Sequence, residues 1–150
     1  MLKWFRRATQ PEAALNGLSL TAAWARPDAA LPSRVGGFFK LTNTGAADRL
    51  VAAASPLAEK VEIHAIKVVG PHIRMRALPD GLRIPAEGTI ELKPRGYHLL
   101  LMGLKAAPAV GSKLPVTLTF EQAGRMEIEL TVGEPGLVGI EILDEEAYRR

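Results

Sequence analysis

The chain of 150 residues contains no cysteine, and this absence excludes several kinds of chemistry. Without thiols there can be no disulfide framework, no thiolate metal site and no cysteine nucleophile. Aromatic residues make up only 5% of the sequence, which leaves few rings for stacking nucleic-acid bases. The 19 Lys and Arg are spread along the chain among 16 Asp and Glu, so the sequence predicts no concentrated basic face. We therefore expect no nucleic-acid binding.

Long apolar runs are also missing. No stretch approaches the roughly 20 apolar residues that a membrane-spanning helix needs. Residues 1–17, MLKWFRRATQPEAALNG, begin with basic residues as a signal peptide does, but no apolar segment follows them. The sequence as given therefore shows no export signal, and we expect no membrane contact from its basic start.

The composition that remains is that of one folded domain. Apolar residues account for 47% and charged residues for 23%. A chain of 150 residues can bury a hydrophobic core without disulfide bonds or structural metals to stabilise it. We expect an N-terminal tail at residues 1–16, a folded domain at 17–133 and a C-terminal extension at 134–150, which begins with a Glu-Pro-Gly breaker.

The body of the chain predicts about nine short strands separated by Gly and Pro. Leu18, Leu20, Ala22 and Trp24 alternate with small or polar residues, as in a half-buried strand. No segment of the body sustains a helical period. We therefore predict an all-β fold, a Greek-key β-sandwich. The further predicted strands lie within 36–42, 48–54, 60–68, 72–78, 82–84, 89–94, 97–104, 113–122 and 125–133.

Two of the three histidines and one methionine lie in adjacent predicted strands, 60–68 and 72–78, which form a hairpin with its turn at 70–71. Because strand side chains alternate between faces, His64 points away from the core side of its strand. Met75 lies opposite Arg74 and Arg76, whose charges would disfavour a bound cation if they were near it.

A third segment, YHLLLMG, places His98, Leu100 and Met102 on one face of its strand. Taken singly, each of these side chains has an ordinary structural interpretation. A lone strand histidine is usually exposed or hydrogen-bonded, and a lone methionine usually fills a core. Periodicity alone does not show that they meet.

The ordered set His64, Met75 and His98 stands within AWARP (23–27), LTNTGAADRLVAAASPLAEKVEIH (41–64), IPAEGTIELKP (84–94) and HLLLMGLK (98–105). With these segments the chain resembles the PCuAC family of periplasmic copper(I)-binding chaperones over roughly residues 18–132. The resemblance implies a cupredoxin-like or immunoglobulin-like sandwich, copper(I) as cargo and a periplasmic location. It also implies transfer to a copper-accepting partner, either a cytochrome c oxidase subunit or another copper chaperone, by a monomer or weak oligomer.

The family signature is a His, a Met about eleven positions later, and then His-x-Met. His64, Met75 and His98 match it, whereas Leu100 stands where the last Met is expected. Imidazole and thioether suit Cu(I), a soft cation that needs no thiolate. Three possibilities stay open for the fourth position: Met102, one strand repeat beyond Leu100; His72 in the hairpin; or a site with three ligands.

No catalytic motif is present. The serines stand in no G-x-S-x-G turn, and the chain has no P-loop, GxGxxG or HExxH sequence. Glu59, Glu62, Glu87 and Glu91 are spaced as solvated strand and turn residues. We therefore expect that this protein is not an enzyme. The alternative to a copper chaperone is a metal-free β-sandwich interaction module with a degenerate copper site.

Overall fold

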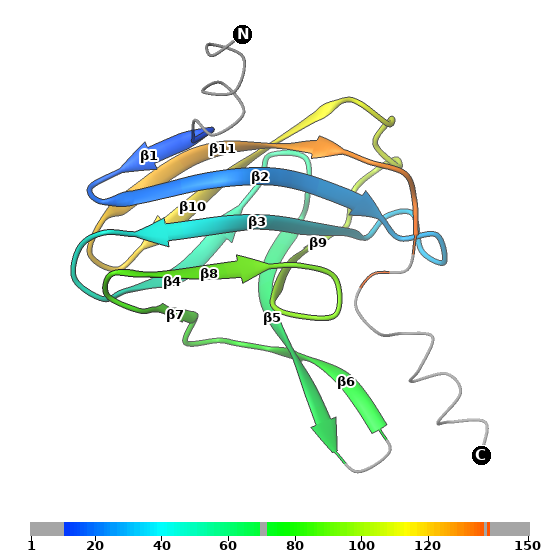
Figure 1. Cartoon of the computed structure of the whole chain (residues 1–150). Helices are drawn as coiled ribbons and strands as arrows, with labels where there is room; N and C mark the ends of the chain where they lie inside the picture. Colours follow the sequence, from blue (N-terminus) through cyan, green and yellow to red (C-terminus); the bar gives the residue numbers. More distant parts are fainter. Residues whose placement is uncertain (1–10, 70–71, 137, 139–150) are drawn as a thin grey trace, which may run out of the picture.

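The computed structural model describes residues 11–69, 72–136 and 138, and the regular elements of this part are eleven strands (Figure 1). The prediction of an all-β fold is confirmed. The strands are β1 (Ala13–Leu15), β2 (Leu18–Pro27), β3 (Val35–Asn43), β4 (Asp48–Ala54), β5 (Lys60–Val69), β6 (His72–Ala77), β7 (Leu82–Ile84), β8 (Gly88–Leu92), β9 (His98–Met102), β10 (Lys113–Phe120) and β11 (Gly124–Val132). Among the described residues we find no helix with the length and apolarity to cross a membrane.

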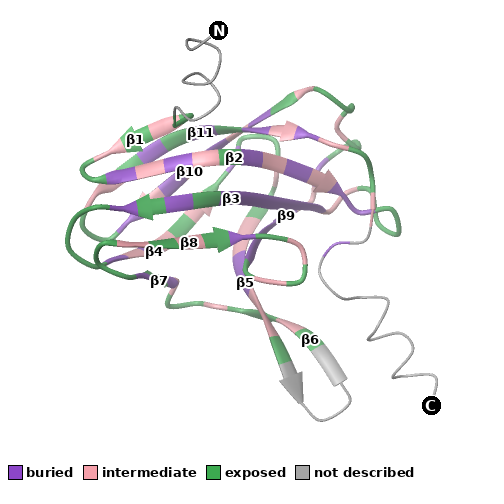
Figure 2. Cartoon of the chain, in the orientation of Figure 1, coloured by how far each residue is buried: buried purple, intermediate pink, exposed green. Residues whose placement is uncertain are grey.

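The strands form one sheet in the order β6-β5-β9-β3-β2-β11-β10-β4-β7, with β1 beside β2 and β8 beside β3. The sheet curls on itself and encloses a core of aliphatic and phenylalanine side chains, among them Phe39, Leu41 and Leu118. Buried segments run along β2, β3 and β9 in Figure 2. Most neighbours are antiparallel, but β2 and β11 pair in parallel. The non-consecutive strand order is the long-range pairing expected of a Greek-key sandwich.

A β-bulge in β2 changes which face its tryptophan occupies. Leu18 and Leu20 lie in the core, but Ala22 has a φ of 55° and the pairing with β3 shifts just before Trp24. An extra residue in one strand turns the following side chains to the other face. The prediction that Trp24 shares a face with Leu18 and Leu20 is therefore wrong, and Trp24 stacks on Phe38 outside the main core.

The predicted hairpin is present as β5 and β6, which pair from His64 with Ala77 to Val69 with His72. Strand β6 lies at the edge of the sheet, and the hairpin projects from the body of the sandwich (Figure 1). The predicted turn at 70–71 lies outside the described residues.

Segments flanking the predicted domain span of 17–133 also contact the sheet. Strand β1 pairs with β2, and Gly136 forms a parallel bridge with Asp28. Val138 is fully buried. A Cβ atom added to Gly36 would come within 2.9 Å of the Val138 Cγ1 atom, so Val138 packs directly over β3. The described part of the predicted C-terminal extension is thus packed against the sandwich.

Candidate metal site

His64 on β5 and His98 on β9 are directly opposite each other in the antiparallel pairing of these strands. Their ring centroids are 5.6 Å apart. The neighbouring Ile63 points into the main core, so His64 occupies the other face, as its alternation predicts. Both imidazoles are nevertheless buried, with His64 8% exposed and His98 fully covered. The pairing therefore brings two distant segments together as a buried imidazole pair.

Each imidazole has one hydrogen-bonded nitrogen and one without a partner. His64 Nε2 donates to Glu62 Oε1 at 2.8 Å, and His98 Nδ1 donates to the Gly96 carbonyl oxygen at 2.9 Å. Both acceptors fix the proton on the bonded nitrogen. The other nitrogens, His64 Nδ1 and His98 Nε2, are buried with no partner in the described part of the chain. Buried polar atoms are rarely left unsatisfied. In a metal-binding histidine, one ring nitrogen coordinates the metal and the other donates a hydrogen bond that fixes the ring. Both imidazoles have this arrangement of one bonded and one free nitrogen.

The local electrostatics favour a neutral His98 ring and an ionised Glu62. Burial lowers the pKa of His98 below its ordinary value of 6.5, against the opposing effect of its bond to Gly96, and the charge of His64 lowers it further. Hydrogen bonds from Lys60 and then His64 hold the pKa of Glu62 below its ordinary 4.5. At neutral pH, His98 is therefore neutral and Glu62 is ionised, so the lone pair of His98 Nε2 is available for coordination.

Met75 lies on the same face as His64. It pairs with Ile66, while Ala77, two residues later, pairs with His64. Diagonal cross-strand neighbours lie about 7–8 Å apart at the backbone, within reach of a long side chain, and methionine has the flexibility to use that reach. Met75 is half-buried. The structure thus brings Met75, His64 and His98 to one face.

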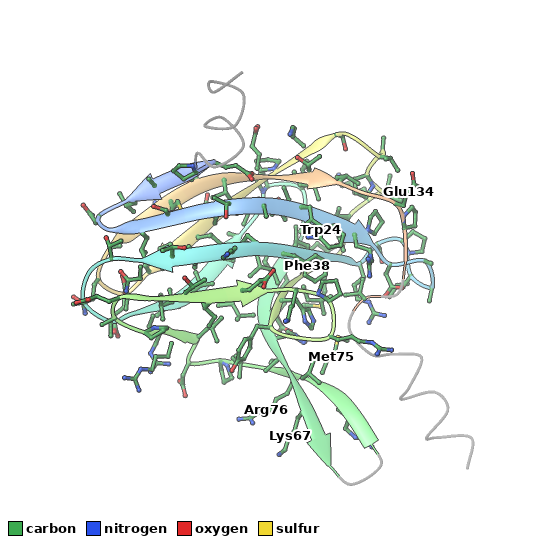
Figure 3. The ribbon with its side chains drawn as sticks, in the orientation of Figure 1. Trp24, Phe38, Lys67, Met75, Arg76 and Glu134 are labelled. Carbon is green, nitrogen blue, oxygen red and sulfur yellow. The ribbon has the colours of Figure 1, made fainter. Side chains whose placement is uncertain are left out.

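Arg74 and Arg76 lie on the other face of the hairpin, since they pair with Lys67 and Ala65. Figure 3 shows Arg76 and Lys67 on the opposite side of the hairpin from Met75. The positive charge that would disfavour a cation is therefore directed away from the imidazole pair.

The possible fourth ligands differ in position. Leu100 pairs with Gly36 on one side and Glu62 on the other, next to the imidazole pair, and is 3% exposed. Met102 pairs with Lys60, four residues along the same face from His98, which corresponds to about 13 Å. The structure does not bring Met102 to the imidazoles. The side chain of His72 lies outside the described residues.

An aromatic cluster lies beside His98 on the β3 side. Phe38 is fully buried, its ring lies 6.4 Å from that of His98, and the Trp24 ring lies 4.7 Å beyond it. Gly36 leaves room for this cluster, because a Cβ there would come within 2.9 Å of Phe38 Cζ. Phe38 was not identified from the sequence, and Trp24 was expected on the core face because the bulge in β2 has no clear sequence signal.

Sequence reasoning also missed Glu62, which it treated as a solvated strand residue. Its position two residues before His64 on one strand face was the available signal, because such side chains are neighbours. Across the described ranges, no three His, Asp or Glu side chains gather as a metal site. The oxygen-rich environment that Ca²⁺ or Mg²⁺ requires is therefore not found there, and the donors that share the face are two imidazoles and a thioether.

Comparison with solved structures places this geometry in a known fold. The apo PCuAC domain from PmoF1 superposes with a TM-score of 0.70 at 26% identity, covering 81% of this chain and 98% of that domain. The solution structure of CuI-DR1885 from Deinococcus radiodurans gives a TM-score of 0.60 at 29% identity, covering 85% of this chain and 84% of that one. The prediction of a PCuAC-type, cupredoxin-like sandwich is confirmed.

Comparison with sequences gives the family. A curated protein of Leifsonia xyli subsp. xyli, named "Putative lipoprotein Lxx21020", is 32% identical over 126 residues, which is 83% of this chain and 75% of that protein. The family model described as "Putative lipoprotein LpqE-like" matches residues 18–132. This span agrees with the extent of the predicted resemblance and contains His64, Met75 and His98. The chain therefore belongs to the LpqE-like family.

Proposed function

We propose that this chain is a copper(I) metallochaperone, not an enzyme, that holds its cargo with His64, His98 and Met75. The observation that carries the proposal is the pair of buried nitrogens, His64 Nδ1 and His98 Nε2, left without partners on imidazoles that face each other. The related structure of DR1885 is named as a CuI form, which supports copper(I) as the metal.

The chemistry of the donors fits this cargo. Cu(I) is soft, and it accepts imidazole nitrogen and thioether sulfur without a thiolate. Glu62 and Gly96 act as orienting groups, because each holds one ring nitrogen and turns the other toward the shared face. Leu100 supplies no donor beside the imidazoles. We therefore propose a site with three ligands, in which Met102 takes no part.

Transfer to a partner follows from the unequal exposure of these donors. Met75 is half-buried on the projecting hairpin, whereas His98 is fully covered. An incoming ligand can reach the metal on the Met75 side and use the position that Leu100 leaves without a donor. The proposed recipient is a copper-accepting protein, either a cytochrome c oxidase subunit or another copper chaperone, and the proposed state of the chain is a monomer or weak oligomer.

We propose that this exchange takes place outside the cytoplasm, in the periplasm or an equivalent envelope space. The family and the Leifsonia xyli relative are both described as lipoproteins, which supports a location at the cell envelope. Mapping the mature N-terminus of the protein purified from its cells tests this location. An unprocessed, unlipidated protein recovered from the cytosol contradicts it.

Anaerobic Cu(I) titration against a chromophoric chelator tests the binding site. The wild type is expected to bind one equivalent, and His64→Ala and His98→Ala to lose at least about 100-fold in affinity, since each removes a ligand. Met102→Leu is the matched control and should bind as the wild type does. Equal and negligible competition by all four proteins would falsify the copper proposal and favour the metal-free interaction module, for which the buried Leu100 is the structural argument.

A further inference from the structure

A groove of about 960 Å³ lies between the hairpin and the neighbouring strands of the sheet. On the hairpin it is lined by Ala65 and Arg76, which face away from His64, and by Ile66, which shares the face of His64; the other walls come from β7, β8 and the turn between β8 and β9. Five cationic side chains line it: Arg49, Arg76, Arg83, Lys93 and Arg95. Strand pairing thus gathers charges that are far apart in the sequence, contrary to the expectation that the basic residues would form no concentrated face.

These charges have little compensation in the described part of the chain. Glu91 is the one acid among the described residues of the groove. Within that part, Arg76, Arg83, Lys93 and Arg95 form no salt bridge with an acidic side chain. Like charges that converge without counter-charges create a positive potential, which a hollowed surface concentrates. The groove is therefore suited to an anionic occupant.

Arg95 provides a second, independent observation. It follows Pro94 in a turn closed by a hydrogen bond from the Gly96 nitrogen to the Lys93 carbonyl at 2.9 Å, and its φ is 68°. Turns of this shape favour Gly or Asn at this position, because a side chain there is strained. An arginine thus occupies a position where the backbone favours glycine, and its guanidinium lines the groove.

The apolar part of the lining indicates which anion fits. Tyr97 is 40% exposed, and Ile66, Leu78 and Ile90 are half-buried in the same groove. A polypeptide segment that alternates acidic and apolar side chains can pair with both kinds of surface. The plane of a lipid bilayer cannot enter a groove beside a projecting hairpin, and a nucleic acid would find one aromatic ring in this part of the structure. We propose that the groove docks an acidic, partly apolar segment of a partner protein.

The groove adjoins the candidate metal site at Gly96. This residue lines the groove, and its carbonyl oxygen accepts the bond from His98 Nδ1. On the hairpin, Arg76 and Met75 are sequence neighbours on opposite faces. A segment docked in the groove would thus hold a partner next to the donors. Docking itself does not depend on copper; only the identification of this partner as the copper-exchange partner rests on the proposed function.

Fluorescence anisotropy with a labelled 12-residue peptide of Glu, Asp and Leu tests the proposal on the full chain. Arg83→Gln and Arg95→Gly are each expected to weaken binding about tenfold, as expected for loss of one charge-assisted contact. Lys113→Gln, which removes one charge at the far end of β10, is the matched control and should change binding less than twofold. Arg95→Gly should melt no lower than the wild type, since glycine relieves the strained backbone.

Equal weakening by Lys113→Gln would show nonspecific attraction and overturn the proposal. Tighter binding of phosphatidylglycerol vesicles or of a single-stranded oligonucleotide, with the same dependence on Arg83 and Arg95, would also overturn it and identify a membrane or a nucleic acid as the occupant. Cu(I) titration of Arg83→Gln and Arg95→Gly separates the two proposals. Unchanged copper affinity with lost peptide binding supports docking, and a failed copper site leaves the peptide result standing.

Discussion

The two faces of the β5–β6 hairpin carry opposite chemistry. One face holds His64 and Met75, an imidazole and a thioether that are buried or half-buried. The other carries Lys67 and Arg76, exposed cations directed to the opposite side of the sheet (Figure 3). Met75 and Arg76 are consecutive in the sequence, and the alternation of a strand places them on opposite faces. The proposed metal-binding surface and a basic surface can therefore share one hairpin, because the backbone lies between them.

This separation matters because electrostatic repulsion falls with distance and with exposure to water. A guanidinium on the donor face would repel a cation held there, in a buried environment where screening is weak. On the rear face the same charges are solvated and available to an anionic partner.

Exchanging Met75 and Arg76 is the most direct way to remove the chemical difference between the two faces. The double variant Met75→Arg/Arg76→Met removes the sulfur donor and places a cation beside the imidazoles. We expect Cu(I) affinity to fall by more than about 100-fold, because a ligand is lost and a repulsive charge is gained. Chelator competition measures it. Arg76→Met alone is the control and should stay within twofold of the wild type; an equal loss in this control would contradict the separation of faces.

Removing the charge behind His64 tests the donor face more gently. Glu62→Gln keeps a group of similar shape but lacks the carboxylate that accepts from His64 Nε2 at 2.8 Å. We expect Cu(I) affinity to fall by roughly 10- to 100-fold, the usual effect of losing a partner that orients a ligand. The same titration checks this, with Glu91→Gln as a control on an exposed strand position. An unchanged affinity in Glu62→Gln would mean that the carboxylate does not set the ring orientation.

Adding a fourth donor beside the imidazoles tests whether Cu(I) affinity can be raised. Leu100→Met places a thioether next to the imidazole pair at nearly constant volume, a substitution that cores tolerate. We expect Cu(I) binding to tighten about fivefold, since a fourth soft ligand becomes available. Leu101→Met, one residue along and directed into the main core, is the matched control. No gain in Leu100→Met would indicate that another side chain already fills the fourth position.

The smallest expected effect is on the stability of the metal-free protein. The pKa of His98 is lowered on folding, so the folded state resists protonation more than the unfolded chain does. The resulting stability is fully present above the ordinary pKa of 6.5 and is lost as the pH falls below it. Denaturant unfolding between pH 8 and pH 5 should show this loss, and His98→Gln should flatten it. The contribution of Glu62, whose pKa is also lowered, disappears only at more acidic pH. A stability that rises on acidification would contradict the burial of a neutral His98.

Much of the fold could be predicted because period-two alternation and Gly or Pro turns mark most strands directly. Strand β1 was missed, since its three residues lie in a segment that lacks a strand pattern. The bulge in β2 was missed as well, because the Thr-Ala-Ala-Trp sequence gives no sign that Ala22 takes a positive φ. Its effect on Trp24 depends on pairing with β3, which is a tertiary property.

Part of the candidate site could also be predicted from the sequence. Alternation places His64, Met75 and His98 on faces of their own strands, and the family resemblance selects them as a set. Their meeting on one surface depends on the register between β5 and β9, which no local pattern encodes. The surroundings of His98 include Phe38 from a third strand. The basic groove has the same origin, because its charges converge only when β4, β6, β7 and β8 are assembled.

The bulge in β2 has a practical consequence for spectroscopy. By turning Trp24 outward it places an indole against Phe38, whose ring lies 6.4 Å from that of His98. The chain has two tryptophans, so replacing Trp4 with Phe leaves Trp24 as a single native fluorophore beside the imidazoles. Its emission then offers a label-free optical test of the proposed Cu(I) binding, in real time and without a competing chelator.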